Sequence, residues 1–433
     1  MTRATIFGGS APQGTIRVSG AKNSATRLLS AAMVADGPVE LGGFPTHIKD
    51  VEYKVAFIRA LGGTVDLDHA GERVTIDSSR LAYAPLEPSF VHLPLRTTYL
   101  LAAGQLLRSG KAIVGFPGGD AIGGAPGGGR GYDQHVMVWE RLGCTVTESE
   151  LGIEISAPNG LHGTRIDFTI STVGGTETAL ICASIAHGPS ELTNAYITPE
   201  VEDLIELLRR MGASIEVFGN SRIEIHGLGG PLDGAHMDVM PDRIEALTWI
   251  VYGVLSGGDL TVERVPFDSL EVPLLHLEKA GIDLFRNSSA AHITPGTLLA
   301  GSVQPFELSC GTYPGVISDM QALFVLLGLG ANGTSRVHDY RYPHRIAWVA
   351  ELAKLVDGHH LTAETGKITV NGPAKFRAGA AGATDVRGSM VAVLAALLAE
   401  GTSTISHVEH ALRGYNDLEG KLRSLGLQIE IGH

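Results

Sequence analysis

Four cations occupy equivalent positions at the starts of predicted helices. Six apolar segments each end at a glycine, and counting back 14 or 15 residues from that glycine reaches Lys22, Arg96, Gly174, Arg243, Asp319 and Arg387. A cation in the first turn of a helix faces the positive end of the helix dipole, which is unfavourable by roughly 0.3–1 kcal/mol. Unpaired backbone N–H groups at helix N-termini also attract anions. The four cations therefore predict a polyanionic substrate; the alternative is that they are surface residues of a repeated scaffold.

The same helix-strand-helix-strand unit occurs six times. The first helices are predicted to end at Gly37, Gly110, Gly188, Gly258, Gly333 and Gly401, and the second helices at Gly62, Gly143, Gly212, Gly281, Gly358 and Gly426. Amphipathic helices that alternate with short β-rich segments predict an α/β or α+β fold. We expect three units in each of two domains, one formed by residues 22–240 and one by residues 1–21 plus 241–433. Two chain crossings between domains would act as a hinge and favour a cleft that closes on ligand.

A glycine-rich loop interrupts the second repeat. Residues 116–135 read FPGGDAIGGAPGGGRGYDQH, which lacks the GK[ST] ending of a phosphate-binding P-loop. Long glycine-rich loops inside compact domains often serve as mobile lids. Asp120 and Arg130 would bring an acid and a cation to an anionic substrate. The alternative is a surface loop with incidental charges.

Composition excludes several classes of protein. The chain has 433 residues, 44% of them hydrophobic, and its longest apolar stretch, which ends at Ala399, is too short to span a bilayer. The start, MTRATIFGGS, has no apolar signal-peptide core, so we expect a cytoplasmic protein. Three scattered cysteines predict neither disulfides nor a zinc site. The formal net charge of −13 argues against a nucleic-acid partner.

Seven motifs carry a family resemblance. In chain order they are SGAKNSATRLL, PGGDAIG, STVGGTET, MPDRIEALTW, SDMQALF, DVRGSMV and LRGYNDLEGKL. Together they resemble the enolpyruvyl transferase family and cover all six repeats. The resemblance implies two inside-out α/β domains, each of three βαβαββ-type units, with the active site in the cleft between them. It further implies phosphoenolpyruvate as a substrate and no metal or organic cofactor.

The resemblance also assigns roles to residues of this chain. Lys22, Arg130 and Arg413 would hold the phosphate and carboxylate of phosphoenolpyruvate. Asp319 would be the general base for the acceptor hydroxyl, and Asp120 the general acid that protonates the methylene carbon. Asp385 would stabilise the oxocarbenium-like centre that develops at C2. The other implied substrate contacts are Asn23, Arg96, Thr172, Val173, Gly174, Arg243, Arg345 and Arg387.

Several positions depart from the family pattern. Asp120 stands where most members have the cysteine that fosfomycin alkylates, so we expect a fosfomycin-resistant enzyme. Ile170 replaces a lysine near the acceptor diphosphate, Tyr313 replaces a histidine, and the loop is about five residues longer. These changes favour the 3′-hydroxyl of UMP as the acceptor, as in the family's nucleoside-antibiotic members. The alternatives are UDP-N-acetylglucosamine, used in cell-wall synthesis, and a non-catalytic nucleotide sensor, which would require loss of the acid or base.

Overall fold

The chain divides into two compact units. The computed structural model describes residues 2–123 and 131–432. The first unit comprises Met1–Ser19, Asp120–Arg130 and Pro241–His433, and the second comprises Gly20–Gly119 and Gly131–Met240. Asp120 therefore groups with the first unit, although the residues on its N-terminal side belong to the second.

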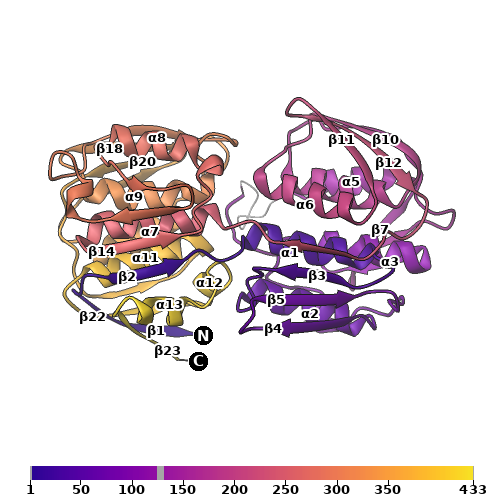
Figure 1. The fold of residues 1–433 in the computed structure, drawn as a ribbon, viewed down its shortest axis with the longest axis horizontal. Helices are drawn as coiled ribbons and strands as arrows, with labels where there is room; N and C mark the ends of the chain where they lie inside the picture. The colour runs from indigo at the N-terminus through magenta and orange to yellow at the C-terminus, as the bar shows by residue number, and fades with distance from the viewer. Residues whose placement is uncertain (1, 124–130, 433) are drawn as a thin grey trace. The chain divides into compact units, whose positions relative to one another are not determined.

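Three sheets enclose the helices of the second unit (Figure 1). Their strand orders are β13(Ala235–Asp238)-β3(Val39–Gly42)-β5(Arg73–Asp77)-β4(Thr64–Asp68), β11(Ser214–Phe218)-β12(Arg222–Leu228)-β10(His187–Thr193)-β9(Arg165–Asp167) and β6(Lys111–Val114)-β8(Gly152–Ser156)-β7(Thr145–Ser149). The helices are α1 (Lys22–Ala31), α2 (Lys49–Ala60), α3 (Ala102–Ser109), α4 (Asp133–Arg141), α5 (Val173–Ser184) and α6 (Pro199–Arg210).

The first unit repeats this plan and incorporates the N-terminal strands. Its sheets have the orders β21(Ala380–Gly382)-β22(Gly401–Ser406)-β1(Arg3–Gly8)-β23(Gln428–Gly432), β15(Phe285–Arg286)-β16(Ala290–Ile293)-β14(Asp259–Glu263)-β2(Gln13–Arg17) and β17(Glu307–Cys310)-β18(Thr334–Asp339)-β20(Lys367–Asn371)-β19(Leu361–Glu364). Its helices are α7 (Arg243–Ser256), α8 (Glu271–Lys279), α9 (Gln321–Leu329), α10 (Ala347–Leu352), α11 (Val386–Leu398), α12 (Glu409–Leu412) and α13 (Leu418–Ser424). Strand β2 pairs in parallel with β14, and β1 lies antiparallel between β22 and β23.

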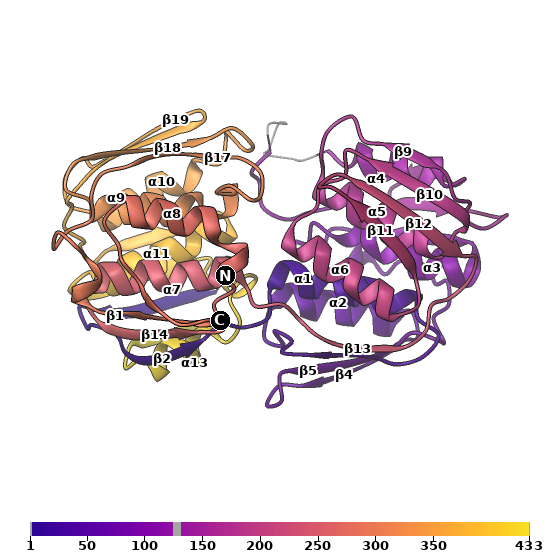
Figure 2. The same cartoon turned by 45° about the horizontal axis from the view of Figure 1, so that its top comes forward.

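The first helix of each repeat is an interior helix. In the first unit α7, α9 and α11 lie side by side with sheets outside them (Figure 2). All nine residues of α9 are buried, which explains why this segment is apolar on every side rather than on one face. The predicted α/β class is confirmed. No helix in the described residues is long and apolar enough to cross a membrane.

Most of the predicted helix starts match the structure. Four of the six residues are the first or second residue of their helix, namely Lys22, Gly174, Arg243 and Arg387. Asp319 lies in the 3-10 turn η7 (Ser318–Met320) that leads into α9. Arg96 differs, because the 3-10 turn η3 (Thr98–Leu101) precedes α3 and leaves Arg96 in the connection before it. At the other end of α7 the left-handed terminator is Gly257, with φ 63°, rather than the predicted Gly258.

Candidate active site

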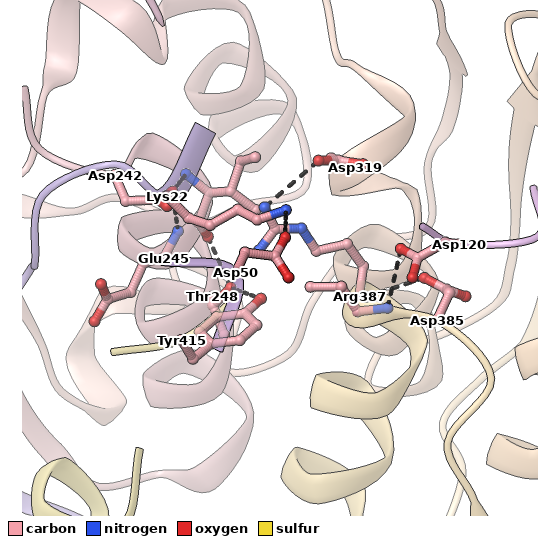
Figure 3. A network of polar contacts seen from close by, with 12 residues as sticks. Lys22, Asp50, Asp120, Asp242, Glu245, Thr248, Asp319, Asp385, Arg387 and Tyr415 are labelled. Atoms are coloured by element: carbon pink, nitrogen blue, oxygen red, sulfur yellow. Dashed lines mark hydrogen bonds and ion pairs between the residues drawn. The ribbon is translucent and has the colours of Figure 1, made fainter. Parts of the chain in front are cut away.

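A buried arginine joins two of the predicted catalytic carboxylates in the first unit. Nη1 of Arg345 lies 2.7 Å from Oδ1 of Asp319, and its Nη2 lies 2.9 Å from Oδ1 of Asp385. Asp385 is the N-cap of α11, where its side chain accepts hydrogen bonds from the backbone N–H groups of Arg387 and Gly388. Nη2 of Arg387 approaches Oδ2 of Asp319 at 3.4 Å (Figure 3). The starts of α9 and α11 thus supply the two carboxylates and Arg387, and Arg345, from the connection between β18 and α10, joins them.

The carboxylates of this cluster stabilise the charged form of the buried arginine Arg345. Burial alone would lower the pKa of Arg345, which is 3% exposed, but the carboxylates of Asp385 and Asp319 raise that pKa well above its ordinary value. Asp319 keeps 29% of its side chain exposed, so a substrate hydroxyl can reach it. Nη1 of Arg387 is buried and has no hydrogen-bond partner among the described residues. A buried donor without a partner is costly, and an anionic ligand would satisfy it.

Asp120 lies at the start of α11. Its Oδ1 is 3.0 Å from Nη1 of Arg413, and its Oδ2 accepts a hydrogen bond of 3.3 Å from the backbone N–H of Val386. Nδ1 of His410 lies 3.8 Å from Oδ1. Asp120 also contributes to the electrostatic stabilisation of charged Arg345. The predicted acid therefore lies beside a predicted phosphoenolpyruvate ligand and belongs to the same charged cluster.

Lys22, the predicted phosphoenolpyruvate ligand of the second unit, pairs with a buried carboxylate. Nζ of Lys22, at the first position of α1, lies 3.0 Å from Oδ2 of Asp50, which is buried in the first turn of α2 (Figure 3). One turn further along α2, Lys54 is fully buried and donates hydrogen bonds to the Ser30 hydroxyl and the Thr26 carbonyl. Burial, with help from Arg27, lowers the pKa of Lys54 well below its ordinary value. The ion pair with Asp50 thus holds the ammonium group of Lys22 in place.

The start of α5 is built for close backbone packing. Thr172 is its N-cap and accepts a hydrogen bond from the Gly175 N–H, and Val173 and Gly174 form its first turn. A Cβ at Gly174 would lie 2.8 Å from the Tyr99 hydroxyl and 2.8 Å from Cε1 of His135, so a larger residue there would force these rings to shift. Asn23 follows Lys22 in α1.

The remaining predicted ligands differ in their surroundings. Arg96 donates a hydrogen bond to the Gly131 carbonyl, and its guanidinium lies 5.6 Å from the Tyr99 ring centroid. In the first unit Arg243 is buried and lies 5.2 Å from the Tyr313 ring centroid. Arg130 lies outside the described residues, as does most of the predicted lid's glycine-rich centre.

Three further residues near the predicted ligands were not predicted from the sequence, namely His410, Asp50 and Lys54. His410 precedes Arg413 by three residues, a spacing that places both on one face of a helical turn. Asp50 and Lys54 share the i, i+4 spacing on α2. Spacing alone would have suggested a surface ion pair for Asp50 and Lys54 and two exposed basic residues for His410 and Arg413, because burial was not apparent from the sequence.

Neither a metal nor a reactive thiol is built into the described residues. No group of three or more His, Cys, Asp or Glu side chains in residues 2–123 and 131–432 could hold a metal ion. All three cysteines are buried. Burial raises the pKa of Cys144 to about 12 and raises the pKa values of Cys182 and Cys310 as well. The thiols therefore stay protonated and unreactive at neutral pH.

The sequence matches a known family over almost its whole length. Residues 6–422 match the family described as EPSP synthase (3-phosphoshikimate 1-carboxyvinyltransferase). The UDP-N-acetylglucosamine 1-carboxyvinyltransferases of Saccharophagus degradans and Beijerinckia indica are each 35% identical to this chain, and each alignment covers 99% of both proteins. The chain belongs to the EPSP synthase family of enolpyruvyl transferases. The resemblance found in the seven motifs is confirmed, and so is the assignment as a transferase.

Solved structures agree with the family assignment. The enolpyruvyl transferase NikO from Streptomyces tendae has a TM-score of 0.87 and 27% identity, with 100% of this chain and 99% of that chain covered. EPSP synthase from Acinetobacter baumannii has a TM-score of 0.72 and 19% identity, with both chains fully covered. The second comparison supports the fold of this enolpyruvyl transferase.

Proposed function

We propose that this enolpyruvyl transferase moves the enolpyruvyl group of phosphoenolpyruvate to the 3′-hydroxyl of UMP and releases phosphate. The observation that carries the proposal is the partly exposed carboxylate of Asp319 beside Arg345 and Arg387, both buried. A carboxylate held in place by two guanidinium groups is suited to accept a proton from a hydroxyl. The same guanidinium groups can balance the charge of an anionic substrate.

The residues divide the reaction between them. Asp120 donates a proton to the methylene carbon of phosphoenolpyruvate, and positive charge develops at C2. Asp385 stabilises that charge while Asp319 takes the proton from the acceptor hydroxyl, whose oxygen bonds to C2. Return of a proton from the new methyl group to Asp120 then accompanies loss of phosphate and forms the enol ether. The chain's own carboxylates thus account for every proton moved between the substrates.

The residues proposed to hold the donor are cations. Lys22 and Arg413 are the residues assigned to phosphoenolpyruvate, with Arg130 as a third. Asp50 supports this role, because it holds the Lys22 ammonium at 3.0 Å and so limits its movement. Arg387 offers a buried Nη1 without a partner among the described residues, which suits a phosphate or carboxylate oxygen.

Ile170 favours a singly phosphorylated acceptor. Its side chain is 55% exposed two residues before the Thr172 cap of α5, so no charge is available at the place where the resemblance expects a lysine. Binding a second phosphate beside an apolar side chain, without a compensating cation, would be costly. The capped N-terminus of α5 still offers N–H groups to one phosphate or to the uracil.

UDP-N-acetylglucosamine is the second candidate acceptor. Relatives that share 35% identity over 99% of the chain are named for that substrate. Phosphate release from phosphoenolpyruvate should be measured with UMP, UDP-N-acetylglucosamine and shikimate 3-phosphate in parallel. We expect the highest kcat/KM with UMP, because Ile170 offers no charge to a second phosphate. The ratio kcat/KM is compared because it reports differential binding of the transition state. A clearly higher kcat/KM with UDP-N-acetylglucosamine would show that this nucleotide, and not UMP, is the acceptor. The residues assigned to phosphoenolpyruvate would be unaffected.

A further inference from the structure

The carboxylate of Asp120 occupies a position made for an anion. Arg413 contacts it at 3.0 Å, the backbone N–H of Val386 at the start of α11 donates to it at 3.3 Å, and His410 lies 3.8 Å away. The Asp120 side chain is only 11% exposed. A guanidinium and a helix N-terminus are the groups that bind free carboxylates and phosphates in proteins.

These contacts conflict with the chemistry proposed for Asp120. Contact with a cation and acceptance of an N–H hydrogen bond both favour the ionised form of a carboxyl group. A general acid must instead carry a proton before it can donate one. The charged groups around Asp120 include the cations Arg413 and Arg345, the titratable His410, and Asp385 as the N-cap of α11. Asp319 is a second carboxylate on Arg345. The guanidinium of Arg413 and the N–H donor at the start of α11 favour the anionic form of Asp120 in this arrangement.

We infer that Asp120 is an internal competitor for phosphoenolpyruvate: its carboxylate occupies Arg413 and the α11 N-terminus in the free enzyme, and the substrate's anionic groups displace it. Displacement removes the guanidinium from Asp120 and places new negative charge beside it. Both changes favour the protonated carboxyl group, so Asp120 takes up one proton from solvent and becomes the acid that the reaction needs. Only this last step rests on the proposed function; the competition itself does not.

Competition predicts that removing the carboxylate improves substrate binding. If Asp120 keeps Arg413 occupied about nine-tenths of the time, the apparent affinity for phosphoenolpyruvate is reduced roughly tenfold. Asp120→Asn preserves the shape of the side chain but lacks the charge, and is therefore expected to bind phosphoenolpyruvate roughly tenfold more tightly. Glu400→Gln is the matched control, because it removes an exposed negative charge from the same unit, and its affinity should equal that of the wild type.

Isothermal titration with phosphoenolpyruvate, in buffers of different ionisation enthalpy at pH 7, measures both quantities. The wild type should take up about one more proton per bound ligand than Asp120→Asn, because only the wild type has a carboxylate to protonate. Asp120→Ser serves the same purpose if the asparagine variant folds poorly. Equal affinity and equal proton uptake in wild type and variant, or undetectable binding by both, would overturn the inference. Tighter binding by Asp120→Asn, together with no turnover by the wild type on any acceptor, would preserve the inference and count against the proposed function.

Discussion

Asp319→Asn is the substitution that most sharply separates catalysis from binding in this site. Asparagine retains an oxygen that can accept the hydrogen bond from Arg345, now 2.7 Å from Asp319, and Arg345 keeps its second partner, Asp385, at 2.9 Å. Arg387 loses only a carboxylate at 3.4 Å. The cluster should therefore keep its geometry. What disappears is the ability to accept a proton, a loss that usually costs 10²–10⁴ in rate, or about 2.7–5.4 kcal/mol.

Two assays test this expectation. Phosphate release should show kcat lowered by about 10²–10⁴, while titration of phosphoenolpyruvate should show a Kd no weaker than that of the wild type, because the substitution removes negative charge from an anion site. Asp357→Asn is the control, since it breaks an exposed Asp–Arg pair of the same unit, 3.8 Å from Arg377, and should leave kcat unchanged. Turnover of Asp319→Asn within a few-fold of the wild type would remove Asp319 from the mechanism.

Three further substitutions test other parts of the account. Asp120→Cys should become sensitive to fosfomycin while the wild type resists it, because the native thiols are buried and a thiolate attacks an epoxide better than a carboxylate does; stoichiometric labelling of the wild type, seen by intact mass, would contradict this. Ile170→Lys should raise kcat/KM for UDP-N-acetylglucosamine relative to UMP by roughly tenfold, whereas Leu151→Lys, at another exposed apolar position, should not; an unchanged ratio would argue against Ile170 as a selectivity position. Burial raises the pKa of Asp203 to about 6, so the folded state holds this proton more tightly than the unfolded state, and stability is lost as pH rises from about 4 to 6. Asp203→Asn should therefore raise stability in urea more at pH 7.5, by up to about 3 kcal/mol, than at pH 4.5, and equal gains at both pH values would refute the shift.

The repeated architecture could be predicted from the sequence because it is written in local patterns. Glycines recur at similar intervals, and residues a fixed distance before them start helices, as Lys22 and Arg243 do. The predicted helix ends at Gly188 and Gly401 are wrong, because these glycines lie in β10 and β22. Arg96 breaks the pattern because a 3-10 turn, Thr98–Leu101, replaces the first helical turn of its repeat. Such a turn leaves the apolar period almost unchanged, so the sequence carried little sign of it.

The electrostatic environment of the site could not be predicted in the same way. Asp120 and Arg413 are 293 residues apart, so no local spacing reveals that they form a pair. Lys54 is fully buried against α1, although lysines are rarely buried. Motifs placed Asp319 and Asp385 in the site, but only tertiary packing shows that Arg345 joins them. The site residues could be named from sequence motifs, whereas their interaction partners and protonation states could be inferred only from the folded structure.

Proton NMR of the reaction itself tests the central claim most directly. Wild-type enzyme is incubated with phosphoenolpyruvate and UMP in D₂O, and the products are followed over time. New vinyl resonances are expected together with a shifted H3′ resonance of the ribose, with deuterium entering the methylene carbon through Asp120 and inorganic phosphate formed in equal amount. Phosphate release without a 3′-enolpyruvyl nucleotide, or vinyl product only when UDP-N-acetylglucosamine replaces UMP, would contradict the central claim.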